Sequence, residues 1–151
     1  MKGQNITIGV DPDSDGHGIA IYIDGKLAEL TKWNLMDFIP HAADSRIFFA
    51  IENVMANQFI YGRNVKANKT VQSKVAMNIG RCQQAQVELE KVLKHHGAKY
   101  TLIKPMKGNL ATDKAQFEKV TGWIGRSNAD ARSAAFMGFL GLKLGGGKNA
   151  D

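Results

Sequence analysis

The sequence predicts an α/β fold: one domain built on a mixed five-stranded sheet flanked by helices. Two observations predict this fold. Short apolar runs of strand length dominate the first third of the chain, and longer segments with apolar residues at every third or fourth position follow. The length of 151 residues suits one domain. We expect the domain to span residues 1–144, followed by a flexible glycine-rich tail at 145–151.

The first third of the chain predicts a β-meander of three strands, at 6–11, 18–23 and 26–33. Turn-forming residues between Pro12 and Gly16 separate the first two strands. The pair Asp24-Gly25 separates the second strand from the third. This pair suits a two-residue hairpin turn, because such a turn needs positive φ angles.

The rest of the chain predicts four helices and two further strands. Residues 53–69 are polar without a clear period, so they predict a loop. The longest helix carries an apolar stripe from Val71 to Val92 and is expected to end at Gly97. Thr112 and either Ser127 or Asn128 are the expected N-caps of the last two helices. We expect helices at 35–43, 70–96, 113–121 and 128–144, and strands at 47–52 and 99–103.

Two of the predicted strands end in an acidic residue, Asp11 and Glu52. A central strand seldom carries an unpaired carboxylate, because burying one costs several kcal/mol, on the order of its lost hydration. If the two strands are neighbours, their carboxylates converge at one edge of the sheet and repel each other. A divalent metal ion is the commonest group that stabilises such a pair. These two acids are therefore the strongest indication of chemistry in the chain.

A third acid, Asp130, lies near the start of the last predicted helix. Small residues surround it and would let the helix approach the sheet closely, namely Ala129, Ala134 and Ala135. The Asp130 carboxylate would then reach the edge at which the other two acids lie. Alternatively, Asp130 only stabilises its helix N-terminus through the macrodipole, by about 0.3 to 1 kcal/mol.

The order of these motifs resembles the ribonuclease-H-like nuclease superfamily, and within it the RuvC-like Holliday junction resolvases. The run Ile8-Gly9-Val10-Asp11-Pro12-Asp13, followed by Gly16-His17-Gly18-Ile19-Ala20, resembles the family's first motif, which leads to the first catalytic aspartate. Ala50-Ile51-Glu52-Asn53 resembles the second acidic motif, and Asp130 aligns with the third. The Asp-Pro-Asp form, the short chain and Gly122-Trp123 resemble phage and phage-derived members.

This resemblance implies a ribonuclease-H-like fold and a metal-dependent endodeoxyribonuclease that resolves four-way (Holliday) DNA junctions by paired nicks. In such hydrolysis one Mg²⁺ activates the attacking water, and another, about 3.5 to 4 Å away, stabilises the leaving oxygen. Asp11 is expected to bridge the ions, with Glu52 and Asp130 each holding one. Oxygen ligands favour Mg²⁺, with Mn²⁺ as a substitute. Two opposed nicks imply a homodimer, and the helix at 70–96 is its candidate interface.

The chain departs from the family at Ser133, where RuvC-like resolvases usually carry another acid. Residues three apart share a helical face, so Ser133 is a candidate weak metal ligand beside Asp130. Three interpretations stay open. Three acids suffice, or the register is shifted so that Asp130 fills the second acidic position, or the substitution disables cleavage and leaves a junction-binding protein.

The formal net charge of +6 favours binding to nucleic acid. One basic group, with aromatic residues interleaved for stacking, comprises Phe59, Tyr61, Arg63, Lys66, Lys69 and Lys74. A second group comprises Lys104, Lys107 and Lys114. The resemblance matches Lys104 and Lys114 to basic residues that contribute to phosphate binding and catalysis, so Lys114 is also a candidate catalytic residue. Solvated surface lysines are the alternative.

The sequence predicts a cytoplasmic protein with no membrane partner, and the family resemblance implies a bacterial or phage-infected cell. It has one cysteine, no signal-peptide pattern and no apolar stretch near the roughly 20 residues that cross a bilayer. A ribonuclease-H-like nuclease acting on RNA or flapped DNA is the alternative function. The hairpin after Asp11 also resembles the phosphate-binding turn of actin-like sugar kinases, but those need a second, duplicated domain that 151 residues cannot hold.

Overall fold

The computed structural model describes residues 3–56, 69–105 and 110–146, and its centre is a five-stranded sheet of order β3-β2-β1-β4-β5. The strands are β1 (Ile6–Asp11), β2 (His17–Ile23), β3 (Lys26–Trp33), β4 (Ile47–Glu52) and β5 (Lys99–Ile103). β1 pairs antiparallel with β2 and parallel with β4, so the sheet is mixed, as predicted. The hairpin between β2 and β3 turns at Asp24 and Gly25, whose φ angles of 50° and 85° are positive.

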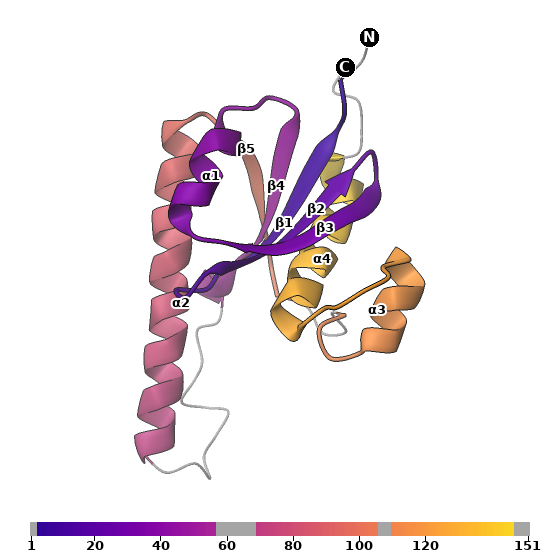
Figure 1. Ribbon diagram of the computed structural model, residues 1–151. Helices are drawn as coiled ribbons and strands as arrows, with labels where there is room; N and C mark the ends of the chain where they lie inside the picture. Colours follow the sequence, from indigo (N-terminus) through magenta and orange to yellow (C-terminus); the bar gives the residue numbers. More distant parts are fainter. Residues whose placement is uncertain (1–2, 57–68, 106–109, 147–151) are drawn as a thin grey trace.

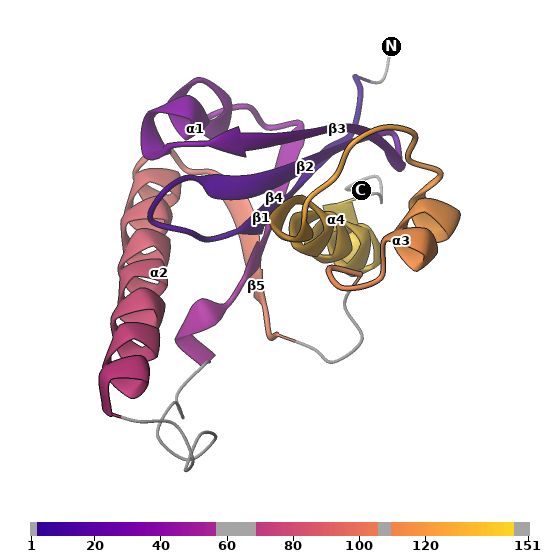
Figure 2. The same cartoon turned by 60° about the horizontal axis from the view of Figure 1, so that its bottom comes forward.

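Helices cover both faces of this sheet (Figure 1). α1 (Leu35–Ala42) and α2 (Lys69–His95) lie on one face, whereas α4 (Ala129–Gly141) lies on the other, with α3 (Lys114–Thr121) beside it (Figure 2). A 3₁₀ turn, η1 (Val54–Ala56), follows β4, and a π-helical turn, η2 (Leu142–Gly146), follows α4. No helix within the described ranges is long and apolar enough to cross a bilayer.

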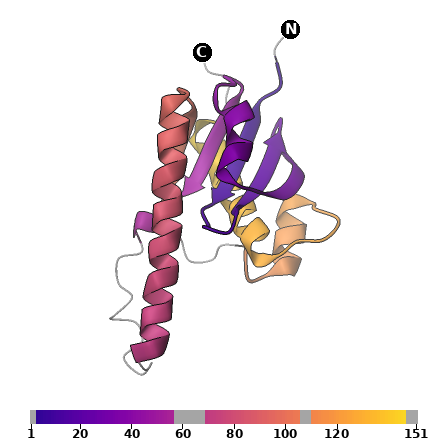
Figure 3. The same ribbon diagram turned by 60° about the vertical axis from the view of Figure 1, so that its left-hand side comes forward.

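The core between the sheet and α1 and α2 is apolar. Val10, Phe38 of α1 and Leu89 and Leu93 of α2 are completely buried there. The helix predicted at 70–96 is confirmed as α2, but its apolar stripe is not buried at its start, where Val71 is 46% exposed. The first half of α2 extends beyond the sheet, so its apolar positions do not reach this core (Figure 3).

The other face of the sheet meets the backbone of α4 directly. A Cβ atom on Gly9 would collide with the carbonyl oxygen of Ala134, and one on Gly18 would lie 2.8 Å from the carbonyl oxygen of Asp130. The Tyr22 hydroxyl donates to the carbonyl oxygen of Ala135 at 2.6 Å. This close approach brings the start of α4 to the end of β1.

The predicted N-cap of the last helix is confirmed at Asn128, whereas the N-cap of the helix before it and the end of the last helix differ from the predictions. Asp113, not Thr112, caps α3, and its carboxylate accepts a hydrogen bond from the amide of Gln116 at 2.9 Å. Asn128 caps α4 by accepting from the amide of Ala131 at 2.8 Å. The predicted last helix ends at Gly141 and continues as η2. The predicted tail lies outside the described residues from position 147 onward.

Candidate active site

The acidic ends of β1 and β4 lie next to each other. The two strands are parallel neighbours with Val10 opposite Ile51, so Asp11 and Glu52 follow at the same edge of the sheet. Both residues are half-buried. The two carboxylates therefore lie close together because their strands are parallel neighbours.

α4 adds two more oxygen groups to this edge. The Asp11 carboxyl interacts with the charges of Glu52 and Asp130 and with the hydroxyl of Ser133. Asp130 is exposed, whereas Ser133 is only 6% exposed and faces the sheet. The four groups thus come together from β1, β4 and α4, although their catalytic and metal-binding roles stay predictions.

Burial and neighbouring negative charges together determine the electrostatics of the cluster. Burial raises the pKa of Asp11 to about 8, and the charge of Glu52, a hydrogen bond with Glu52 and the charge of Asp130 act in the same direction. The Ser133 hydroxyl opposes them by hydrogen bonding to Asp11. At neutral pH Asp11 therefore keeps a proton, which reduces the repulsion between the acids. Such perturbed groups are more frequent at functional sites than elsewhere.

The residues fit a divalent cation by their chemistry. Carboxylate and hydroxyl oxygens are the ligands that Mg²⁺ and Mn²⁺ prefer. Among the described residues, no three His, Cys, Asp or Glu side chains already stand in an arrangement that holds a metal ion. The Asp11 carboxyl group is instead hydrogen-bonded to Glu52 and carries a proton at neutral pH, because its pKa is raised. A cation would replace that proton.

Gln86 of α2 fixes the chain that follows Glu52. Its side chain is fully buried, and Oε1 accepts hydrogen bonds from the amides of Val54 at 2.8 Å and Met55 at 3.3 Å. Its Nε2 donates to Oδ1 of Asn53 at 3.0 Å. Gln86 was not among the predicted site residues. In the sequence it is marked only as a polar side chain beside the apolar stripe.

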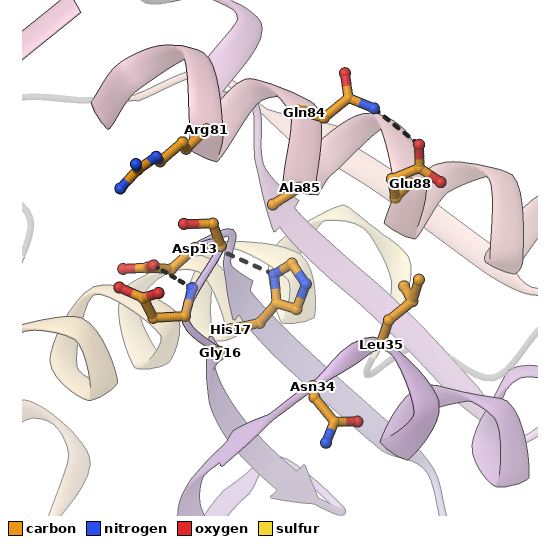
Figure 4. A pocket seen from close by; sticks show the side chains of 11 residues that line it. Asp13, Gly16, His17, Asn34, Leu35, Arg81, Gln84, Ala85 and Glu88 are labelled. Carbon is orange, nitrogen blue, oxygen red and sulfur yellow. Dashed lines mark hydrogen bonds between the residues drawn. The ribbon is translucent and has the colours of Figure 1, made fainter. Parts of the chain in front are cut away.

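A pocket of about 360 Å³ lies between the loop after Asp11 and α2 (Figure 4). His17 forms part of its wall, and Nδ1 of the imidazole accepts a hydrogen bond from the Asp13 amide at 3.3 Å. Burial lowers the pKa of His17, so the ring is neutral and carries its proton on Nε2. Three carboxylates and one guanidinium line the pocket, which is therefore net negative: Asp13, Asp15, Glu88 and Arg81.

The predicted DNA-binding residues that the structure describes, Lys74, Lys104 and Lys114, lie on different elements, and their role stays a prediction. Lys74 is exposed on the part of α2 that extends beyond the sheet, whereas Lys114 is exposed at the start of α3, across the sheet from it. Lys104 is exposed after β5. The remaining members lie outside the described residues, namely Phe59, Tyr61, Arg63, Lys66, Lys107 and the side chain of Lys69.

Comparison with known proteins supports the fold. No protein-family model and no curated protein matches the sequence. A second structure of Thermus thermophilus RuvC aligns with a TM-score of 0.49, while T. thermophilus RuvC in complex with Holliday junction substrate aligns with a TM-score of 0.50. Both are 16% identical, and the alignments cover 93% of this chain and 96% of theirs. The alignment with the complex confirms the predicted fold class, and this chain has the RuvC-type ribonuclease-H-like fold.

Proposed function

We propose that this protein is a divalent-metal-dependent endodeoxyribonuclease that resolves four-way DNA junctions. The convergence of Asp11, Glu52 and Asp130 at one sheet edge carries this proposal. Nuclease chemistry needs clustered carboxylates because they hold the cations that phosphodiester hydrolysis uses. T. thermophilus RuvC, which has the same fold, is in complex with a Holliday junction substrate, and this supports DNA junctions as the substrate.

The three acids would hold Mg²⁺, with Mn²⁺ as a substitute. Bound Mg²⁺ would supply an activated water and stabilise the leaving oxygen. Asp11 interacts with both other acids, so it is the expected bridging ligand. Ser133 hydrogen-bonds to Asp11 and would hold that carboxylate in place when its proton leaves. Lys114, exposed at the start of α3, would neutralise charge on the transferred phosphate.

Two opposed nicks require two sites, so we propose that the protein acts as a homodimer. α2 is the proposed interface because its first half extends beyond the sheet and leaves Met77 56% exposed. Met77→Glu should shift the sedimentation of the protein from dimer to monomer. A wild-type protein that sediments as a monomer at the concentration that cleaves junctions would exclude this interface. The protein would act in the cytoplasm of a bacterial or phage-infected cell.

The test of the function is cleavage of synthetic DNA in MgCl₂. We expect the four-way junction to be cut in preference to linear duplex, flapped DNA and an RNA–DNA hybrid. Asp11→Asn and Glu52→Gln should each reduce the rate by at least about a hundredfold, the scale of losing one directly acting group. Glu29→Gln, an exposed acid on β3, is the matched control. Preferred cleavage of the hybrid or flap would favour the alternative nuclease, and junction binding without cleavage would favour a binding protein.

A further inference from the structure

We propose that a positively charged groove beside edge strand β3 binds the phosphodiester backbone of the DNA strand that leads to the acidic cluster. We call it the β3–α3 groove; it measures about 540 Å³ and is lined by Lys32, Lys114, Arg126, Ser127 and Asn128, among others. The charges of these residues make the β3–α3 groove a site for phosphate groups. That the phosphate groups belong to DNA rests on the proposed function.

Three cations from three separate segments converge on this groove. Lys32 belongs to β3, Lys114 is the first residue of α3, and Arg126 lies in the connection between α3 and α4. The ion pairs within the described parts of the chain join Arg46 to Asp44 and Lys91 to Glu88, so they involve none of the three. Like charges around one groove repel each other. An anion between them would remove that repulsion.

The position of Lys114 also argues against a purely structural role. A positive charge in the first turn of a helix is electrostatically unfavourable, because the helix N-terminus is already positive. Lys114 occupies that position in α3. The N-terminus of α4, with Asn128 as its cap, lies at the same groove, but the Asp130 carboxylate in its first turn offsets part of the positive potential of this helix end. The three cations, more than the helix ends, therefore favour an anionic ligand in the groove.

Hydrogen bonds fix the wall that carries Arg126. Arg132 of α4 donates through NH1 to the carbonyl oxygen of Ser127 at 2.8 Å, and through Nε to the carbonyl oxygen of Ala111 at 2.9 Å. The indole Nε1 of Trp123 donates to the carbonyl oxygen of Arg126 at 3.0 Å. The backbone of this wall is thus held in place before a ligand binds, which reduces the entropy lost on binding.

The groove lies two strands away from Asp11 of the acidic cluster. Lys32 pairs with Gly18 of β2, and Gly18 pairs with Asp11 of β1. Strands lie about 4.8 Å apart, so the backbone of Lys32 is about 10 Å from that of Asp11. This is roughly the rise of three base pairs along the axis of a duplex, at about 3.4 Å each. One DNA strand can therefore contact the groove and the acids together.

The pocket on the other side of the loop after Asp11 has the opposite charge balance. It presents Asp13, Asp15 and Glu88 against a single cation, Arg81 (Figure 4). Phosphates are repelled there and attracted to the β3–α3 groove, which has three cations and no acid among its lining residues. The two sides of the site thus differ in charge, and the β3 side is the one that suits a DNA backbone.

The salt dependence of DNA binding tests this inference. Affinities of wild type, Lys32→Gln, Arg126→Gln and the double variant would be measured from about 50 to 200 mM salt without divalent metal. Each lost phosphate contact should reduce the slope of log affinity against log salt by about 0.7 to 0.9, so the double variant should lose about 1.4 to 1.8. Lys26→Gln and Lys119→Gln, exposed on the same strand and on α3, are the matched controls.

Slopes equal to those of the controls, in variants with wild-type melting temperatures, would overturn the inference and leave the proposed function intact. Phosphorus NMR with inorganic phosphate tests whether the groove binds a free anion in place of the phosphates of DNA. If the variants lose phosphate binding but keep the wild-type DNA slope, the groove is not a DNA site. If the wild type shows no junction preference or cleavage but the variants still lose slope on linear DNA, the proposed function fails and the inference stands.

Discussion

Without metal, the Asp11→Asn variant should be more stable than the wild type, and this difference in the free energy of unfolding should grow as the pH rises. In the folded protein, burial and the nearby acids raise the pKa of Asp11 from 3.8 to about 8. Between these values the unfolded chain has lost the proton while the folded chain keeps it. The free energy of unfolding of the wild type therefore falls as pH rises from about 4 to about 8. The asparagine side chain cannot ionise, so the variant lacks this loss.

The size of the effect follows from linkage. A difference of one bound proton changes the free energy of unfolding by about 1.36 kcal/mol per pH unit. From about pH 5 to pH 8 the variant should gain at most about 4 kcal/mol relative to wild type. Asp11 is only half-buried, so solvent screens the charge and we expect about 2 to 4 kcal/mol.

Urea denaturation of both proteins in a chelator, at about pH 5 and pH 8, measures this difference. Comparing variant with wild type at each pH cancels the titration of all other groups. Adding Mg²⁺ at pH 8 should then stabilise the wild type more than the variant, because the ion replaces the proton and binds only the folded site. A stability difference between variant and wild type that stays the same from about pH 5 to pH 8 would refute the electrostatic account of the cluster.

Three further substitutions test the parts that build the site. Gly18→Ala should cost about 1 to 3 kcal/mol of unfolding free energy and weaken Mg²⁺ binding, because its Cβ meets the Asp130 carbonyl; Gly80→Ala, with open space around it, is the control. In urea denaturation Gln86→Leu should cost about 2 to 4 kcal/mol, because the buried amide of Val54 and the partly buried amide of Met55 lose their acceptor, whereas Gln84→Leu at an exposed position should not. Ser133→Asp should destabilise the metal-free protein at pH 8 and change junction cleavage by less than about tenfold, if three acids suffice.

The strands and their acidic ends could be predicted because the signal is local. The run before Asp11 and the Asp24-Gly25 turn each specify their own backbone geometry. The adjacency of β1 and β4 could not be derived in the same way, because strand order depends on contacts between segments about 40 residues apart. The convergence of Asp11 and Glu52 was therefore predicted only for the case that their strands are neighbours, and the structure shows that they are.

The failures of prediction have similar physical causes. Thr112 and Asp113 are both good N-caps, so only the packing of α3 decides between them. Apolar residues recur at helical spacing around Val71, and this spacing does not tell whether the helix packs on the sheet or extends past it. The exposure of Val71 therefore could not be predicted. Lys32 could not be predicted as a phosphate-binding residue from the sequence, because only the strand register places it opposite Gly18 and two strands from Asp11.

Ser133 and the raised pKa of Asp11 are two aspects of one balance. A fourth carboxylate at position 133 would add to the repulsion that already raises this pKa, and the metal-free site would lose more stability. The Ser133 hydroxyl instead lowers the pKa of Asp11, which makes the proton easier for a cation to displace. A neutral group at this position thus reduces the charge available to hold metal while it lowers the cost of releasing the proton. The raised pKa of Asp11 therefore keeps a proton on this carboxyl group in the place where the proposed function puts a metal ion.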